Sequence, residues 1–232
     1  MTNLDDLEFR PEQFSGKARL FPLPNLVMFP HVMQPLHIFE PRYRALLADA
    51  LAGDRMIAMM MLAPGWESDY DGRPPLLPIG CLTRVAMHQK QEDDCSNVLL
   101  LGLRRLRLVR ELPPHHLYRE AEVEIIEDVV SPAGADGRVA LQHSLVKAFR
   151  KVLPQLGVAD QLEQLLGNNL SLGALTDVVS YAIDLEAALK ESLLAEANVD
   201  RRATLLLEHL DRVGAGVPSG GLTGFPPQFS LN

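Results

Sequence analysis

Proline is spread very unevenly along this chain, and its distribution constrains the fold more than any other feature of the sequence. Residues 18–128 hold 11 of the 17 prolines, whereas residues 139–213 hold only Pro154. Because proline lacks a backbone N–H and its ring clashes with the preceding helical turn, it is excluded from helix interiors. The first stretch therefore favours strands and turns, and the second favours helices. The sequence predicts an α+β protein in which a β domain precedes a helical bundle.

Composition predicts the boundaries of these regions. Residues 1–17 are polar and acidic, which is typical of a flexible arm. Residues 18–128 form the β domain, and the small, turn-forming residues 129–138 form a linker. Residues 139–213 form the helical bundle, and the Gly- and Pro-rich residues 214–232 are typical of a disordered tail.

Three patterns predict the strands of the β domain. Residues 56–62 are apolar at every position, which indicates a strand covered on both faces. Residues 80–89 and 98–103 flank a polar stretch, 90–97, and together predict a hairpin. Residues 119–125 alternate between charged and apolar side chains, as a half-buried strand does.

Apolar stripes at helical spacing predict the helices. One helix interrupts the strands, beginning at Pro41 and ending at Gly53. In the second region, helices are predicted within 141–152, 162–166, 172–182 and 203–213. Asp200 is the predicted cap of the last of these.

Charge and segment composition exclude several classes of protein. The net charge is −8, and the two regions each carry an acidic excess, which argues against nucleic acid as the partner. No apolar run approaches the roughly 18 residues of a membrane-spanning helix, and the acidic start is not a secretory signal. Cys81 and Cys95 are too few for a disulfide framework. We expect a cytoplasmic protein without a membrane partner.

The motifs of common enzyme and metal sites are missing. The phosphate-binding Gly-x-x-x-x-Gly-Lys-[Ser/Thr] loop, the Gly-x-Ser-x-Gly elbow and metal-ligand spacings of His and Cys are all absent from the sequence. We therefore predict no catalytic residue, no metal and no cofactor. A hydrolase site assembled in space from a serine and Lys147, Lys151 or Lys190 stays open as an alternative, although these lysines lie on predicted solvated helix faces.

Two groups of residues are candidates for binding. Seven of the eight methionines lie between residues 28 and 87, and methionine adapts to varied apolar partners. The candidate apolar surface comprises Met28, Phe29, Met33, Trp66 and Tyr70. The segment 103–110 offers a strip of arginines to an acidic partner: Arg104, Arg105, Arg107 and Arg110. The alternative for the strip is pairing with Glu120, Glu122 and Glu124 on a neighbouring strand.

Residues 20–44 carry the most specific pattern in the chain. They read Leu-Phe-Pro-Leu-Pro-Asn-Leu-Val-Met-Phe-Pro-His-Val-Met-Gln-Pro-Leu-His-Ile-Phe-Glu-Pro-Arg-Tyr-Arg. This resembles the opening of the LON domain, the N-terminal substrate-binding domain of ATP-dependent Lon proteases (peptidase S16 family). Further similar segments extend the match to about residues 18–213; they are 77–84, 102–108, 119–124 and 193–203.

The resemblance implies a PUA-like β barrel followed by a helical bundle. It also implies a bacterial, non-catalytic module that binds unfolded or apolar polypeptide segments or a protein partner, linked to proteolysis or quality control. The sequence stops at residue 232 without ATPase or protease motifs, so we expect a stand-alone LON-domain protein. PUA-like barrels in other families bind RNA, so RNA binding through the arginine strip is the alternative function. The partner's identity and any small-molecule ligand stay open.

Overall fold

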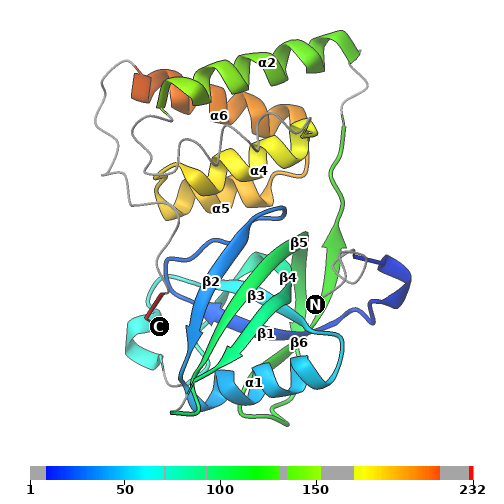
Figure 1. The fold of residues 1–232 in the computed structure, drawn as a ribbon, viewed down its shortest axis with the longest axis vertical. Coiled ribbons are helices and arrows are strands. Elements are labelled where there is room, and N and C mark those ends of the chain that lie inside the picture. Colours follow the sequence, from blue (N-terminus) through cyan, green and yellow to red (C-terminus); the bar gives the residue numbers. More distant parts are fainter. Residues whose placement is uncertain are drawn as a thin grey trace. The chain divides into compact units, whose positions relative to one another are not determined.

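The structure is a computed structural model in which a mainly β unit is followed by a helical unit (Figure 1). It describes residues 9–70, 72–91, 93–130, 135–152, 170–214 and 230–231. The chain divides into two compact units, one ending at Ile126 and the other beginning at Glu127, with Phe229–Asn232 joining the first. The α+β class is confirmed.

The first unit is built on a sheet that closes into a barrel. Its strands are β1 (Lys17–Leu23), β2 (Met33–Ile38), β3 (Met56–Leu62), β4 (Leu76–Lys90), β5 (Ser96–Glu111), β6 (Arg119–Ile126) and β7 (Ser230–Leu231). They follow the order β4-β3-β1-β6-β5-β2-β7, and β4 also pairs with β5. That additional pairing closes a ring of β1, β3, β4, β5 and β6, while β2 and β7 extend the sheet outside the ring. The closed sheet agrees with the barrel that the resemblance implied.

Small residues make room inside this barrel. Ala18, Ala58 and Ala121 are fully or almost fully buried in one cluster with larger aliphatic side chains. At Gly80 of β4, an added Cβ would lie 2.5 Å from the Met59 backbone oxygen, so only glycine fits there. Strand β3 is buried on both faces, as its continuous apolar pattern predicted.

The β4–β5 hairpin confirms a second expectation and extends it. Both strands are longer than predicted, because their pairing continues from Lys90 opposite Ser96 to Ile79 opposite Arg107. Strand β5 is long enough to pair with β4 along most of its length, with β2 through Ser96–Leu101 and with β6 through Arg105–Glu111.

Helix α1 (Pro41–Ala52) begins at Pro41 and ends before Gly53, as predicted, and it lies against β1 (Figure 1). The Tyr43 hydroxyl donates to the backbone carbonyl of Pro22 at 2.9 Å, and its ring lies 4.1 Å from that of Phe21. Two short 3-10 helices, η2 (Pro11–Gln13) and η3 (Trp66–Asp69), complete the described elements of this unit.

The helical unit contains α2 (Ala135–Val152), α4 (Leu172–Ala182), α5 (Ala187–Ala195) and α6 (Val199–Gly214). Helix α2 begins inside the predicted linker, and α5 was not predicted. The predicted cap is also wrong: the Asn198 side chain accepts the Arg201 N–H at 3.0 Å, and Asp200 lies in the first turn. The predicted helix within 162–166 lies outside the described residues.

At each terminus, the described residues contact the first unit. Phe9 is buried in the barrel cluster and packs edge-on against Phe14, with ring centroids 6.0 Å apart, because an aromatic ring gains by leaving water. Phe9 and Phe14 therefore anchor the arm on the barrel, whereas Arg10, Pro11 and Glu12 between them are exposed. At the other terminus, Ser230 and Leu231 pair with Leu36 and His37, since β2 offers an edge of backbone groups. Among the described helices, none is long and apolar enough to cross a membrane.

Candidate functional site

An apolar row crosses three neighbouring strands on one face of the sheet. Pro35 of β2 lies opposite Leu99 of β5, and Leu99 lies opposite Met87 of β4. Met87 is 66% exposed, and Pro35 and Leu99 are half-buried. Met33, which is 50% exposed, extends the surface along β2 on the same face as Pro35. We call Met33, Pro35, Leu99 and Met87 the apolar row.

Alternation along β2 explains why these side chains face outward. Gln34, Leu36 and Ile38 are buried, so Met33 and Pro35 point away from the core. Pro35 cannot donate a backbone hydrogen bond, which suits a strand lying outside the closed ring. The outward positions of β2 that belong to the row are thus occupied by apolar residues and carry no charge.

Met28 and Phe29 were expected to belong to an exposed surface, and this expectation is wrong. Their exposed fractions are 2% and 0%. The turn that carries them is hydrogen-bonded to β5, because His31 N–H donates to the Gly102 carbonyl and Gly102 N–H donates to the Val32 carbonyl, both at 2.9 Å. An added Cβ at Gly102 would lie 2.0 Å from the Phe29 carbonyl oxygen. A glycine inside a strand marks such a close backbone approach, and this signal was available in the sequence.

Trp66 and Tyr70 are half-buried in a separate cluster of side chains. Their rings meet edge to face with centroids 5.5 Å apart. The Tyr70 hydroxyl donates to Glu40 at 2.9 Å, and the Arg42 guanidinium lies 4.7 Å from the centroid of the Tyr70 ring. The Glu40-Pro41-Arg42 segment at the start of α1 therefore holds the loop after β3, and these two aromatic residues do not join the apolar row.

The electrostatics of this cluster give no sign of acid–base chemistry. Burial raises the pKa of Tyr43. Burial, together with the hydrogen bond to Glu40, raises the pKa of Tyr70. Both phenols therefore stay protonated at neutral pH. Among the described residues, no group of three His, Cys, Asp or Glu side chains could hold a metal ion.

The four arginines of segment 103–110 do not form one exposed strip. Arg105 is 3% exposed, and the Arg104 guanidinium lies 5.2 Å from the centroid of the Phe9 ring. Arg107 lies 3.9 Å from Glu124, and Arg110 pairs with Glu122 through two nitrogens. The predicted pairing with the neighbouring strand is thus confirmed for Glu122 and Glu124.

Lys190 was left open as part of a Ser–Lys site. Its ammonium nitrogen lies 3.5 Å from the Tyr181 backbone carbonyl, and burial lowers the pKa of Lys190. The nearby Ser192 hydroxyl donates to the Leu189 carbonyl at 2.9 Å. These hydrogen bonds to helix carbonyls give both side chains structural roles.

Sequence reasoning missed three members of the apolar row: Pro35, Leu99 and Met87. Apolar residues fill both faces of β5 at 98–101, so alternation alone does not say which of them face outward. A register shift between Val85 and Met87 also reverses the alternation of β4 at that point.

Comparison with known proteins connects this fold to one family. The family model described as the ATP-dependent protease La (LON) substrate-binding domain matches residues 17–212. Lon protease 2 of Myxococcus xanthus is 29% identical over 196 residues, which cover 83% of this chain and 23% of the relative. The Lon protease of Anaeromyxobacter dehalogenans is 27% identical over 206 residues, which cover 87% and 24%. The chain therefore spans about a quarter of the length of these curated relatives.

Solved structures show the same fold. The N-terminal domain of a Mycobacterium avium complex Lon protease matches with a TM-score of 0.64 at 17% identity, covering 84% of this chain and 98% of that one. A Lon N-terminal domain protein from Xanthomonas campestris matches with a TM-score of 0.59 at 21% identity, covering 83% and 97%. With most of its length matched by the family model, the chain belongs to the LON substrate-binding domain family.

Proposed function

We propose that this chain binds polypeptide segments that expose apolar side chains, and that it does so without catalysing a reaction on them. The apolar row is the observation that carries the proposal. Met33 and Met87 are 50% and 66% exposed on the same sheet face, and Leu99 of β5 lies between Pro35 of β2 and Met87 of β4. Contiguous exposed apolar surface is uncommon on soluble proteins and marks interaction sites.

The side chains of the row suit a partner of variable sequence. Methionine has three rotatable bonds and a polarizable sulfur, so Met33 and Met87 can adapt to different apolar groups. The family description, a substrate-binding domain of an ATP-dependent protease, supports a polypeptide as the partner and a role linked to proteolysis.

The proposed contact is to the face of the sheet rather than to its edge. β7 already pairs with β2 at Leu36 and His37, on the side of β2 away from β5. Binding an extended peptide as an added strand would compete with this pairing. Strand pairing uses the backbone groups at the edge of β2, so a ligand on the face of the sheet would not compete with β7.

The arginines favour a polypeptide over RNA. Arg107 and Arg110 are paired with glutamates, and Arg105 is buried, so few of the cations could meet phosphates without breaking an ion pair.

Fluorescence anisotropy with a labelled, permanently unfolded protein tests the proposal. Saturable binding is expected, and the Met87→Glu substitution should weaken it at least about fivefold because a carboxylate would be buried against apolar groups. Leu117→Glu is the matched control, because Leu117 is 73% exposed on the segment between β5 and β6. Failure to saturate by about 100 μM, a weak affinity, would count against the proposal, as would equal effects of the two substitutions.

A further inference from the structure

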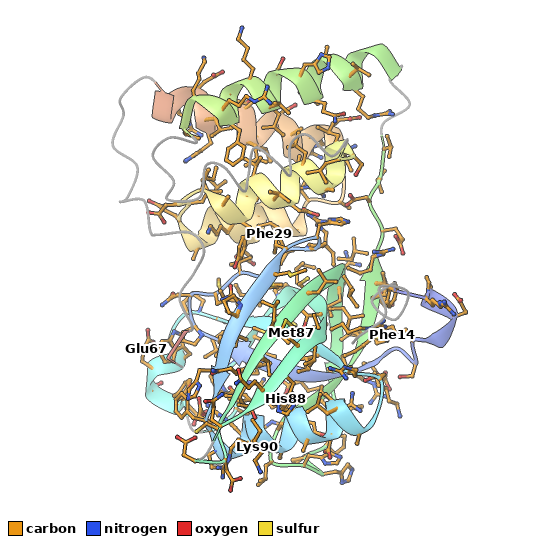
Figure 2. All side chains as sticks on the ribbon, in the orientation of Figure 1. Phe14, Phe29, Glu67, Met87, His88 and Lys90 are labelled. Carbon is orange, nitrogen blue, oxygen red and sulfur yellow. The ribbon has the colours of Figure 1, made fainter. Side chains whose placement is uncertain are left out.

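A cleft of about 290 Å³ lies between helix α1 and the β4–β5 hairpin. Leu47, Ala48 and Leu51 line it from α1. His88 and Lys90 line it from β4. Figure 2 shows His88 and Lys90 on the part of β4 nearest α1.

This cleft and the apolar row use opposite faces of the same strand. Met87 pairs with the half-buried Leu99, whereas His88 pairs with Val98, which is 2% exposed. Successive side chains of a strand point to opposite faces. A ligand in the cleft therefore need not touch the residues of the apolar row.

Among the charged side chains around the cleft, the Arg44 guanidinium is the cation available to bind a ligand. Lys90 and Asp94 form an ion pair of 2.8 Å, and the hydrogen bond from Lys90 lowers the pKa of Asp94. Arg44 is half-buried at the same cleft. Within the described part of the chain, its guanidinium has no hydrogen-bond or ion-pair partner, although its charge acts on Asp94 from a distance.

The remaining polar groups at the cleft are an imidazole and a hydroxyl. His88 Nε2 lies 3.2 Å from the hydroxyl oxygen of Ser96, which is 7% exposed. The cleft thus combines a guanidinium, a hydroxyl–imidazole pair and an aliphatic wall. A planar guanidinium matches the two oxygens of a carboxylate, and the aliphatic wall matches a short apolar group.

We propose that this cleft binds a carboxylate that carries a short apolar group. Arg44 holds the carboxylate, and the apolar group lies against Leu47 and Leu51. The volume of about 290 Å³ is at the small end of ligand sites, so it suits one such group rather than a nucleotide. The ligand is either a free aliphatic acid or the carboxyl end of a polypeptide that finishes with an aliphatic residue.

NMR titration of the whole ¹⁵N-labelled chain with 4-methylpentanoate tests this site. We expect saturable shifts at residues 44–51 and 88–96, with a dissociation constant of about 1 mM because the ligand has few heavy atoms. The neutral 4-methylpentanamide should bind at least about fivefold more weakly, since the charge-assisted hydrogen bond is lost. Inorganic phosphate should also bind more weakly, because it cannot use the aliphatic wall.

Three variants locate the site. Arg44→Gln should weaken binding about tenfold, which is the lower end expected for a hydrogen bond to a charged group. Ala48→Glu places a carboxylate, which repels the ligand's carboxylate, at an exposed position on the cleft. It should also weaken binding, and it tests the site if Arg44→Gln does not fold. Arg107→Gln removes the same charge from an exposed position on β5 and should leave binding unchanged. Equal binding of acid and amide, equal binding of phosphate, or indifference to both cleft variants would overturn the proposal.

A final pair of ligands identifies the source of the carboxylate. A short peptide that ends in leucine is compared in its free-acid and amidated forms, and tighter binding of the free acid assigns the site to polypeptide ends. Binding of 4-methylpentanoate without binding of the peptide assigns it to free acids. Met87→Glu should leave both titrations unchanged, so that failure of the apolar row and failure of the cleft are distinguishable.

Discussion

Arg202 and Asp128 form a two-pronged ion pair that ties the segment before α2 to helix α6. The guanidinium nitrogens lie 3.1 and 2.9 Å from the two carboxylate oxygens, and Arg202 is 0% exposed. Thr176 accepts a further hydrogen bond from Arg202 at 2.8 Å, and the buried Asp177 lies 3.7 Å away. Gly173 allows this arrangement, because an added Cβ there would lie 2.5 Å from an Asp128 oxygen.

Removing Arg202 should strongly destabilise the helical unit. Arg202→Met removes the buried cation that pairs with Asp128 and Asp177, and breaking a buried pair in this way costs about 3–5 kcal/mol. Arg201→Met is the control, because Arg201 is 75% exposed and its ion pair with Glu196 is a surface pair worth about 0–1 kcal/mol. Urea unfolding followed by circular dichroism at 222 nm compares them. Similar midpoints for the two variants would contradict the role assigned to Arg202.

Substitutions of Phe29 and Met33 should have opposite effects on stability and binding. Phe29 lies four residues before Met33, the first residue of β2. Phe29→Ala empties a fully buried site, which costs about 3–5 kcal/mol of unfolding free energy. Met33→Ala, at a half-exposed position, should change the unfolding free energy by less than about 0.5 kcal/mol while weakening polypeptide binding. Thermal unfolding and anisotropy on the same samples measure both quantities. A stable Phe29→Ala protein with impaired binding would restore Phe29 to the binding surface.

Acid should weaken the barrel through Glu111. Burial alone would raise the pKa of Glu111, but hydrogen bonds from Arg119 and Arg73 outweigh it, so the pKa lies below its ordinary value of 4.5. A depressed pKa in the folded state means that the contribution is complete above pH 4.5 and is lost as pH falls through the lower, folded-state value. Urea unfolding between pH 7 and pH 3 should show a shallower acid loss for Glu111→Gln than for the unmodified protein. Glu124→Gln changes a side chain that is 66% exposed, so this variant should lose as much stability in acid as the unmodified protein does.

The cap of α6 can be tested at Asn198. Its side chain accepts the Arg201 N–H, and replacing such a cap by alanine costs about 1 kcal/mol. Asn198→Ala should therefore lower the urea midpoint of the helical unit. Asn198→Ser retains an accepting oxygen, so its urea midpoint should stay close to that of the unmodified protein. An unchanged midpoint for Asn198→Ala would show that the hydrogen bond does not stabilise the helix.

The elements that sequence predicted well are those with strong local signals. Strand β3, the hairpin and α1 follow from apolar runs, a polar turn and Pro41, and each was confirmed. The failures come from long-range contacts. Phe29 is buried because a turn meets β5 at Gly102, and β7 forms because β2 presents an edge.

The candidate site was less predictable than the fold for the same reason. Met33 was foreseen, but the row depends on which residues of three strands lie opposite one another. The register shift next to Met87 fixes that alignment, and no local pattern in the sequence records it. Likewise, Arg44 and Lys90 lie far apart in sequence and line one cleft only because of how the chain folds.

Strand β5 serves two parts of the first unit at once. Its first half carries Leu99 of the apolar row, and its second half pairs with β6 to close the barrel. Any ligand that binds the folded state alone adds to its stability in proportion to the logarithm of its free concentration. Occupancy of the sheet face should therefore slow amide hydrogen exchange wherever exchange requires β5 to unfold, including Leu106 and Leu108 at the end that pairs with β6. Because the apolar row and the barrel closure share this strand, unfolding β5 would remove both at once.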